Sequence, residues 1–333
     1  MTSRERVLTA LKLQEPDRVP WIENYVHKEL AEKILGRAIP DPPGTARIAP
    51  EILEGLAIDD ISYNFMPPRF AKTEMRGDIE IVGEGLLKTW EDYERFKKTM
   101  PDPGSAEFYK PAELYLKNYK KEYAAMANIR FGPSNTYLSM GIEHFSYTLY
   151  DDPGLVEAVM DMFSSFTDKV LGVVQNMGFD MVYVSDDLAF RSGTLFSPKH
   201  INRFFMPHMK KLADKIKLPW IYHSCGNINS ILDDLLSLGM NGISNLEPGP
   251  MDIFQLKKDY GNRVCLMGNI DLHYTLSKGT VEETENEVRE KIQKVGPGGG
   301  YIMATSNGVA AYCKVENVVA MNSALIKYGH YPL

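Results

Sequence analysis

A histidine and a cysteine stand two positions apart, at His223 and Cys225, in the second half of the chain. Imidazole and thiolate are common zinc ligands, and residues two apart on a strand share one face. A catalytic zinc site takes about three protein ligands. The candidates for the third are one cysteine and three carboxylates, namely Cys313, Glu23, Asp187 and Glu247. The competing interpretation is a buried histidine bonded to a carboxylate, beside an unreactive cysteine.

Other polar residues follow apolar runs in the same way. Asp186 and Asp187 are adjacent, so on a strand one can enter a site while the other caps residues 190–192. We expect Asp187 and Asn269 to be catalytic together with His223. The remaining residues are expected to contact a substrate, and they are Glu23, Asp186, Asn245, Glu247, Asp271 and Asn307. The alternative at each position is a turn or helix-capping role, which Asn and Asp side chains also favour.

Eight apolar runs predict the strands that position these residues. They cover 19–25, 61–65, 123–129, 181–187, 220–225, 242–247, 264–269 and 301–306. Most are apolar through their middle, which is typical of parallel strands buried on both faces. Helical patterns lie between them, such as the one that begins with the capping box of Thr280 and Glu283. This alternation predicts an α/β fold, a (β/α)8 TIM barrel with its site at the C-terminal strand ends. An open doubly wound sheet is the alternative.

The rest of the chain elaborates this barrel. Residues 1–18 are predicted to be an N-terminal extension, and 66–122 an inserted helical segment. The length of 333 residues alone would suggest two domains at roughly 150 residues each. Because barrels reach about 250 residues as one unit, we predict a single domain over 1–333.

Composition narrows the class of function. The chain has 37 basic and 44 acidic residues, a net charge of −7, so we expect no nucleic acid and no membrane as partner. It has no run of about 18 apolar residues that could span a bilayer. With no visible signal peptide and three cysteines, the sequence predicts a cytoplasmic protein with reduced thiols.

The order of several short motifs resembles the uroporphyrinogen decarboxylase-like superfamily, and the resemblance covers nearly the whole chain. The motifs lie at 4–11, 16–20, 185–189, 197–198, 223–227, 268–271 and 315–318. Each is weak alone, but their order and spacing together are specific. The resemblance implies a (β/α)8 barrel with its site at the C-terminal mouth, in agreement with the strand pattern.

This superfamily contains two chemistries. The resemblance implies that its decarboxylases grip a porphyrinogen through arginines in the opening segment. Here residues 21–28 contain no arginine and place Glu23 where a cation would be wanted. A buried anion beside anionic substrate groups is unfavourable. The sequence therefore resembles the other branch, the cobamide-dependent methyltransferases, which move a methyl group between a corrinoid protein and a thiol or a pterin.

The thiol-using members of that branch bind zinc through a His-x-Cys motif and a cysteine after the last strand. His223 and Cys225 match the first pair, whereas Asn307 takes the place of the second cysteine and Cys313 lies six residues later. A thiol acceptor needs its pKa lowered, but the N5 amine of tetrahydrofolate needs no metal. This departure favours a pterin acceptor and leaves zinc open.

The predicted function is methyl transfer between a cobamide (methylcobalamin) on a partner corrinoid protein and tetrahydrofolate or a thiol acceptor. A porphyrinogen decarboxylase and a non-catalytic corrinoid- or ligand-binding barrel are the alternatives. The sequence leaves open whether zinc binds at His223 and Cys225, what Cys313 does, and whether the protein is a homodimer.

Overall fold

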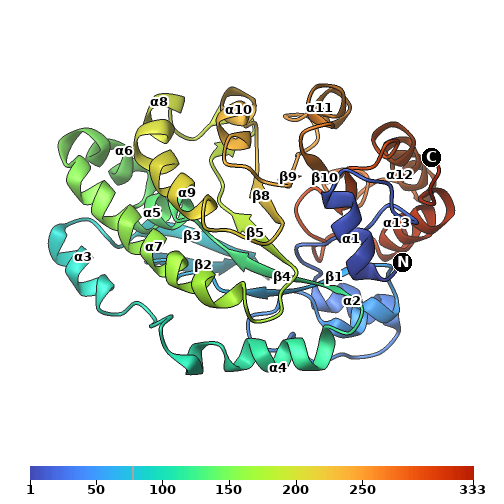
Figure 1. The fold of residues 1–333 in the computed structure, drawn as a ribbon, viewed down its shortest axis with the longest axis horizontal. Helices are drawn as coiled ribbons and strands as arrows, with labels where there is room; N and C mark the ends of the chain where they lie inside the picture. The colour runs from blue at the N-terminus through green and yellow to red at the C-terminus, as the bar shows by residue number, and fades with distance from the viewer. Residues whose placement is uncertain (77–78) are drawn as a thin grey trace.

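A parallel sheet forms the centre of the protein, in a computed structural model that describes residues 1–76 and 79–333 (Figure 1). Within these residues, seven parallel strands are hydrogen-bonded in the order β1-β4-β5-β8-β9-β10-β11. Their bounds are β1 (Asp60–Asn64), β4 (Ala124–Ile129), β5 (Met181–Ser185), β8 (Trp220–Ser224), β9 (Gly242–Asn245), β10 (Cys265–Ile270) and β11 (Tyr301–Thr305). Nearly every residue in them is buried, as expected for strands that are apolar through their middle.

The predicted first strand, 19–25, is reduced to a bridge between the two ends of this sheet. Trp21 forms an isolated parallel bridge with Met303 of β11, and its carbonyl accepts the N–H of Asp59 at 2.8 Å. Pro20 has no N–H, and the N–H of Trp21 is donated to the Asp59 carboxylate at 2.9 Å, so the ladder does not extend. The α/β class and the parallel strand order are therefore as predicted, but this strand is not a regular one.

Helices surround the strands in Figure 1. They are α2 (Lys28–Leu35), α5 (Pro133–Met140), α6 (Ile142–Asp151), α7 (Pro153–Val174), α8 (Pro198–His200), α9 (Met206–Ala213), α10 (Leu232–Leu236), α11 (Ile253–Tyr260), α12 (Val281–Val295) and α13 (Val315–Tyr328). The capping box predicted at Thr280 and Glu283 is confirmed at the start of α12. None of the described helices is long and apolar enough to cross a membrane.

Helix α1 (Ser3–Leu11) closes the N-terminal end of the sheet interior. Its buried Val7, Ala10 and Leu11 pack with the inward-facing residues of the strands, which include Ala124, Met181, Ile221 and Cys265 near the strand starts. Cys265 is thus a core residue. With that end filled, the inward-facing side chains reach solvent at the opposite, C-terminal ends of the strands, called the mouth below.

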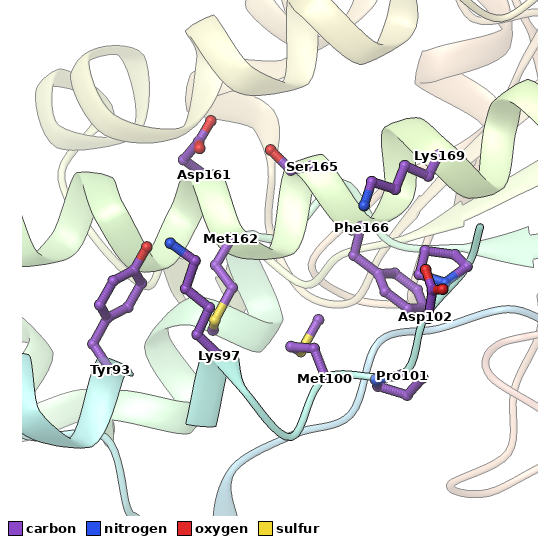
Figure 2. Close-up of a pocket in the computed structure, with 11 residues that line it drawn as sticks. Tyr93, Lys97, Met100, Pro101, Asp102, Asp161, Met162, Ser165, Phe166 and Lys169 are labelled. Atoms are coloured by element: carbon purple, nitrogen blue, oxygen red, sulfur yellow. The ribbon is translucent and has the colours of Figure 1, made fainter. Parts of the chain in front are cut away.

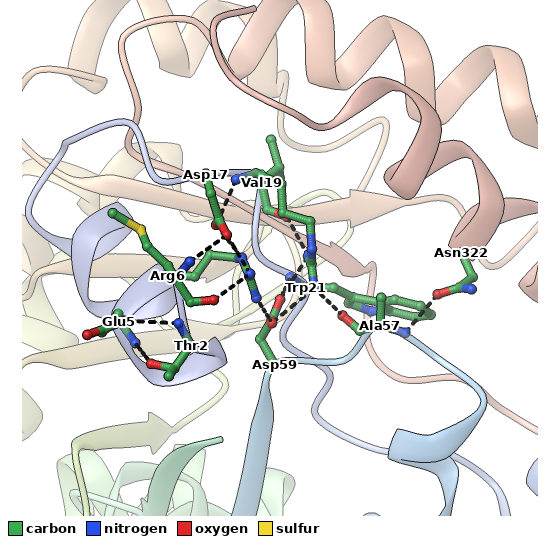
Figure 3. A network of polar contacts seen from close by, with 11 residues as sticks. Thr2, Glu5, Arg6, Asp17, Val19, Trp21, Ala57, Asp59 and Asn322 are labelled. Carbon is green, nitrogen blue, oxygen red and sulfur yellow. Dashed lines mark hydrogen bonds and ion pairs between the residues drawn. The ribbon is translucent and has the colours of Figure 1, made fainter. Parts of the chain in front are cut away.

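Buried ion pairs fix the N-terminal segment to the sheet (Figure 3). Arg6 donates to Asp17 and to Asp59, each at 2.6 Å, and Arg18 donates to Asp59 at 3.0 Å. Asp59 directly precedes β1 and also holds the N–H of Trp21. Arg6 and Arg18, from motifs 4–11 and 16–20, therefore have a structural role, because they hold the Trp21 segment between β11 and β1.

The segment 66–122 corrects the sequence prediction in its first half. It begins with an antiparallel hairpin of β2 (Ala71–Arg76) and β3 (Ile79–Gly85), and only then forms α3 (Trp90–Lys97), a 3-10 turn (Ala106–Phe108) and α4 (Lys110–Tyr119). Thr73, Ile81 and Val82 favour extended backbone. The stretches in which apolar and charged residues alternate around them are too short to predict a strand pair from the sequence.

Candidate functional site

Three side chains from neighbouring strand ends converge at the mouth: Asp187, His223 and Cys225. One ligand atom of each lies within 4.8 Å of those of the other two. His223 Nε2 is 3.6 Å from Cys225 Sγ and 3.8 Å from Asp187 Oδ1. His223 is part of β8, which pairs with β5, and Asp187 follows β5 at the same edge.

Buried hydroxyl groups orient the His223 ring. The ring is nearly inaccessible, and its Nδ1 lies 2.8 Å from the hydroxyl of Tyr183, which is 3.1 Å from Ser244 Oγ. This contact turns Nε2 toward Cys225 and Asp187. Burial lowers the pKa of His223 to about 4, with the charge of Asp187 opposing the shift. The ring is therefore neutral at pH 7, as a metal ligand must be.

The Cys225 thiol points into the same space. Its Sγ lies 3.8 Å from the amide nitrogen of Asn245, and its backbone N–H donates to Asp187 Oδ1 at 2.8 Å. Burial and the nearby negative charge of Asp187 raise the pKa of Cys225 well above its usual range. An uncharged thiol is a poor nucleophile, so the side chain becomes a strong ligand only beside a cation.

The adjacent aspartates have different environments, as their alternation on the strand predicts. The Asp187 side chain is 45% exposed at the mouth. Asp186 is fully buried, and its carboxylate accepts the backbone N–H groups of Phe131, Gly132 and Ser134 at 2.6, 3.2 and 2.9 Å. It therefore holds the start of α5 rather than residues 190–192. Burial raises the pKa of Asp186 to about 6, against the effects of the Arg130 charge and of these donors.

The Asp187–His223–Cys225 group fits a tetrahedral metal ion such as zinc. With zinc–ligand bonds of about 2.0 to 2.3 Å, ligand atoms in a tetrahedron lie about 3.3 to 3.8 Å apart. The two separations from His223 Nε2, 3.6 and 3.8 Å, fall within that spacing. The set of one imidazole, one thiol and one carboxylate suits zinc, and three ligands leave a fourth position open.

The other candidate ligands are not among the three residues whose ligand atoms converge. Cys313 is buried in the hydrophobic core after β11. Glu23 is also buried, and its carboxylate accepts hydrogen bonds from Thr305 Oγ1 at 2.8 Å and from Trp21 Nε1 at 3.2 Å. Burial raises the pKa of Glu23 to about 7. Glu247 is partly exposed, with its carboxylate 3.8 Å from Arg191.

The remaining predicted residues surround the mouth at different depths. Asn269 is buried at the end of β10, where its amide nitrogen donates to the carbonyl of Leu246 and its amide oxygen has no partner within the described part of the chain. Asp271 accepts the N–H of His273 at 2.8 Å in the following turn, and Asn307 is exposed. Asn245 and Asn269 are thus the amides nearest the strand ends, while Asp271 and Asn307 lie in loops.

Two arginines at the mouth escaped the sequence analysis. Arg130 directly follows β4, and Arg47 donates to Asn24 Oδ1 at 3.1 Å. The positive charges of both arginines lower the pKa of His223, in addition to the larger effect of burial. Arg130 could have been found, because it lies two positions past the inward-facing Asn128 of the strand. Arg47 comes from a loop and left no such signal.

Comparison with known proteins identifies the family of this chain. The model of the family described as "Uroporphyrinogen decarboxylase (URO-D)" matches residues 76–328. The chain belongs to the URO-D family. Its similarity to relatives extends across both chemistries of that family, as the curated proteins show.

The proteins similar to this chain include two methyltransferases of Methanosarcina species. The methylcobamide:CoM methyltransferase MtaA of Methanosarcina barkeri is 27% identical over 174 residues, which are 52% of this chain and 49% of that protein. Methylcobamide:CoM methyltransferase MtbA of Methanosarcina acetivorans is 25% identical and is matched over 99% of both chains. The chain thus spans about half the length of the first relative.

A decarboxylase and a solved structure complete the comparison. Uroporphyrinogen decarboxylase of Coxiella burnetii is 23% identical over 188 residues, 54% of this chain and half of that protein. The solved structure described as a methyltransferase from Methanosarcina mazei has a TM-score of 0.74 at 19% identity, covering 98% of this chain and 99% of the other. This last match establishes a shared fold.

A surface cavity of about 350 Å³ lies away from the mouth of this URO-D family chain (Figure 2). It is lined by residues of α3, of the loop 100–103 and of α7, among them Tyr93, Lys97 and Lys169. None of the three converging side chains lines it. The strand ends are a better candidate for a reactive site than this cavity, because the ionisable side chains with specific partners gather at the strand ends.

Proposed function

We propose that this protein transfers a methyl group from a methylated corrinoid, carried by a partner protein, to a thiol acceptor at the mouth. The observation that carries the proposal is the convergence of Asp187, His223 and Cys225 within 4.8 Å. The sequence lacks the second zinc-binding cysteine of thiol-using relatives, and Asp187 supplies a third ligand in its place. Relatives named as methylcobamide:CoM methyltransferases support the corrinoid as methyl carrier.

These three side chains would hold a zinc ion. When bound, zinc supplies a Lewis acid that lowers the pKa of an acceptor thiol. Tyr183 and Ser244 keep the His223 ring in its ligating orientation, and the N–H of Cys225 fixes one oxygen of Asp187. Asn245 and Asn269 line the strand ends beside the group and would orient the acceptor.

The transfer is an in-line displacement. The acceptor sulfur forms a bond to the methyl carbon while the carbon–cobalt bond breaks. The electron pair of the broken carbon–cobalt bond stays on the corrinoid. The thiol proton leaves to solvent, which reaches the mouth at the exposed Asp187 side chain. Placing the two reactants in line supplies most of the rate.

We also propose that the fold is a closed barrel. The Trp21 segment takes the position of an eighth strand and closes the sheet into the predicted (β/α)8 barrel, as one domain over 1–333. The mouth then faces the docked corrinoid protein. We expect the protein to act in the cytoplasm, where thiols such as Cys225 stay reduced.

The test uses purified, zinc-loaded protein with free methylcobalamin, whose absorbance spectrum changes on demethylation. Thiols and tetrahydrofolate are offered separately as acceptors. We expect transfer to a thiol that is lost in Cys225→Ser and His223→Ala and kept in Cys265→Ala, which removes a core thiol. Transfer to tetrahydrofolate alone would show that the acceptor is a pterin and would refute the thiol acceptor. Transfer to neither would refute the whole proposal.

A further inference from the structure

We propose that Lys291 is a positioning residue that acts from α12 through the end of β10 and presents the side-chain oxygen of Asn269 to the molecule in the mouth. The buried pair of Lys291 and Glu287 holds the backbone on both sides of that strand end. That the molecule in the mouth is a methyl acceptor rests on the proposed function, whereas the positioning of Asn269 does not.

Lys291 lies on the buried face of α12, where an apolar residue would be expected. The other buried residues of this helix recur at three- and four-residue spacing, as on the apolar side of an amphipathic helix. They are Thr284, Val288, Ile292 and Val295. The Lys291 side chain is only 8% exposed. Burial lowers its pKa, with the charge of Glu287 opposing the shift. Because an ammonium group is costly to bury, it needs specific partners at this position.

The partners of Lys291 lead to the end of β10. Its Nζ donates to the backbone carbonyl of Asn269 at 2.6 Å and to Glu287 Oε1. The same Glu287 oxygen accepts the backbone N–H of Asp271 at 3.0 Å. The pair on α12 therefore holds the backbone at 269 and at 271, one residue on each side of Ile270.

The sheet itself supports this strand end on one side. The ladder between β9 and β10 covers the first two residues of β10, whereas the ladder with β11 continues to Ile270. Asn269 thus lies past the ladder with β9, and its buried carbonyl takes the Lys291 ammonium group as donor. Lys291 therefore secures the strand end where β9 no longer does.

The side chain of Asn269 faces the mouth with one polar atom unused. Cys265 and Met267 of β10 belong to the interior cluster, so Asn269 continues the same inward face. Its side-chain nitrogen donates to the carbonyl of Leu246, which follows β9, and this contact fixes the plane of the amide. Its side-chain oxygen is buried and has no partner among the described residues. A buried acceptor left unpaired is costly, so we infer that a donor N–H or O–H of the ligand completes it.

Stability alone does not account for the pair on α12. Well-packed apolar residues of similar volume often replace a buried ion pair at no cost in stability. Apolar side chains cannot reproduce the contacts with the Asn269 carbonyl and the Asp271 N–H, however. The distinctive contribution of Lys291 and Glu287 is therefore the placement of the strand end that carries Asn269.

Nuclear magnetic resonance of isotope-labelled protein tests the positioning without any reaction. The side-chain amide signal of Asn269 is identified as the one that disappears in Asn269→Ala. We expect Lys291→Met to shift this signal and to speed its exchange with solvent, because the contact with the Leu246 carbonyl loosens. Glu287→Gln, which keeps the size of the side chain, should act in the same direction but less strongly.

Lys257→Met is the matched control. Lys257 is also partly buried, and its Nζ donates to the backbone carbonyl of Gly299 at 2.6 Å, before the start of β11 and away from the mouth. Its loss should leave the Asn269 signal unchanged. Lys291→Arg keeps a charged donor and should keep most of the wild-type signal, which shows that the donor rather than the exact side chain is needed.

Methyl transfer from free methylcobalamin to 2-mercaptoethanol measures what the positioning contributes. Asn269→Ala and Lys291→Met should each raise the KM for the thiol about 3- to 10-fold, as for the loss of one hydrogen bond, and leave the KM for methylcobalamin unchanged. Because Lys291 acts through Asn269, the double variant should be no worse than Asn269→Ala alone.

An Asn269 signal that is the same in wild type and in Lys291→Met would overturn the inference. Effects of the two substitutions on the thiol KM that add in the double variant would also overturn it. A signal that shifts as expected, in a protein that transfers no methyl group to any acceptor, would refute only the proposed function.

Discussion

The hydroxyl of Tyr183 provides a test of how the metal site is positioned. Tyr183→Phe removes the contacts at 2.8 Å to His223 Nδ1 and at 3.1 Å to Ser244 Oγ, and it changes no ligand atom. The ring of Tyr183 is fully buried, so water cannot replace the hydroxyl. Contacts that orient a ligating histidine are worth about 10- to 100-fold in metal affinity.

The same substitution leaves two buried polar groups without a partner, each costing about 1 to 3 kcal/mol, so the total is about 2 to 6 kcal/mol of stability. At roughly 2 °C per kcal/mol, we expect a decrease in Tm of about 4 to 12 °C. Zinc affinity is measured by competition with a chromogenic chelator, and Tm by circular dichroism of the metal-free protein. The two readouts separate the loss of metal affinity from the loss of stability.

Tyr301→Phe is the matched control. Tyr301 is also fully buried in the sheet, and its hydroxyl donates to the carbonyl of Gly268 at 2.9 Å, away from His223. It should lower Tm without changing zinc affinity. If Tyr183→Phe and Tyr301→Phe bind zinc equally well, the Tyr183 contact does not position the ligand and the reasoning is refuted.

Three further substitutions test the account elsewhere. Asp59→Asn leaves Arg6 and Arg18 without their shared carboxylate and should cost about 3 to 5 kcal/mol, seen as a lower Tm. Glu23→Gln should flatten the pH dependence of Tm. The pKa of about 7 lets the folded protein keep a proton that the unfolded chain loses above about pH 4.5. The stability that this group contributes is therefore fully present below about pH 4.5 and is lost as the pH rises through about 7. Cys313→Ala should leave zinc affinity unchanged, since this thiol packs in the core.

Exposed ion pairs supply the controls for the two carboxylate substitutions. Asp41→Asn breaks a pair with Lys28 in which the carboxylate is 86% exposed, and it should change Tm little. An equally small effect of Asp59→Asn would show that the buried pairs do not hold the N-terminal segment. Glu54→Gln, at an exposed pair with Arg37, should keep the wild-type pH profile. Loss of zinc in Cys313→Ala would restore that cysteine as a ligand.

The sequence predicted the parallel strands well because burial on both faces leaves a continuous apolar run. It failed where tertiary partners decide the outcome. The segment 19–25 has a strand-like composition, yet the Asp59 carboxylate takes the N–H of Trp21 and limits pairing to a bridge. Nothing near Trp21 in the sequence reveals that partner 38 residues away.

The candidate site shows the same division. The spacing of His223 and Cys225 predicted two residues that the structure brings together with Asp187, and the alternation at Asp186 and Asp187 separated a buried carboxylate from an exposed one. Which carboxylate joins the histidine depends on β5 pairing with β8, a long-range fact. Arg47 was missed for a related reason, because the loop that carries it is placed by its contacts with β1.

The zinc content of the purified protein tests the central claim most directly. Elemental analysis should give about one zinc per chain in the wild type, and none in Cys225→Ser and Asp187→Ala, with both variants folded by circular dichroism. Wild-type protein that contains no zinc, takes up none and still demethylates methylcobalamin would contradict the account. So would an Asp187→Ala variant that keeps its zinc in full, because Asp187 would then not be the third ligand.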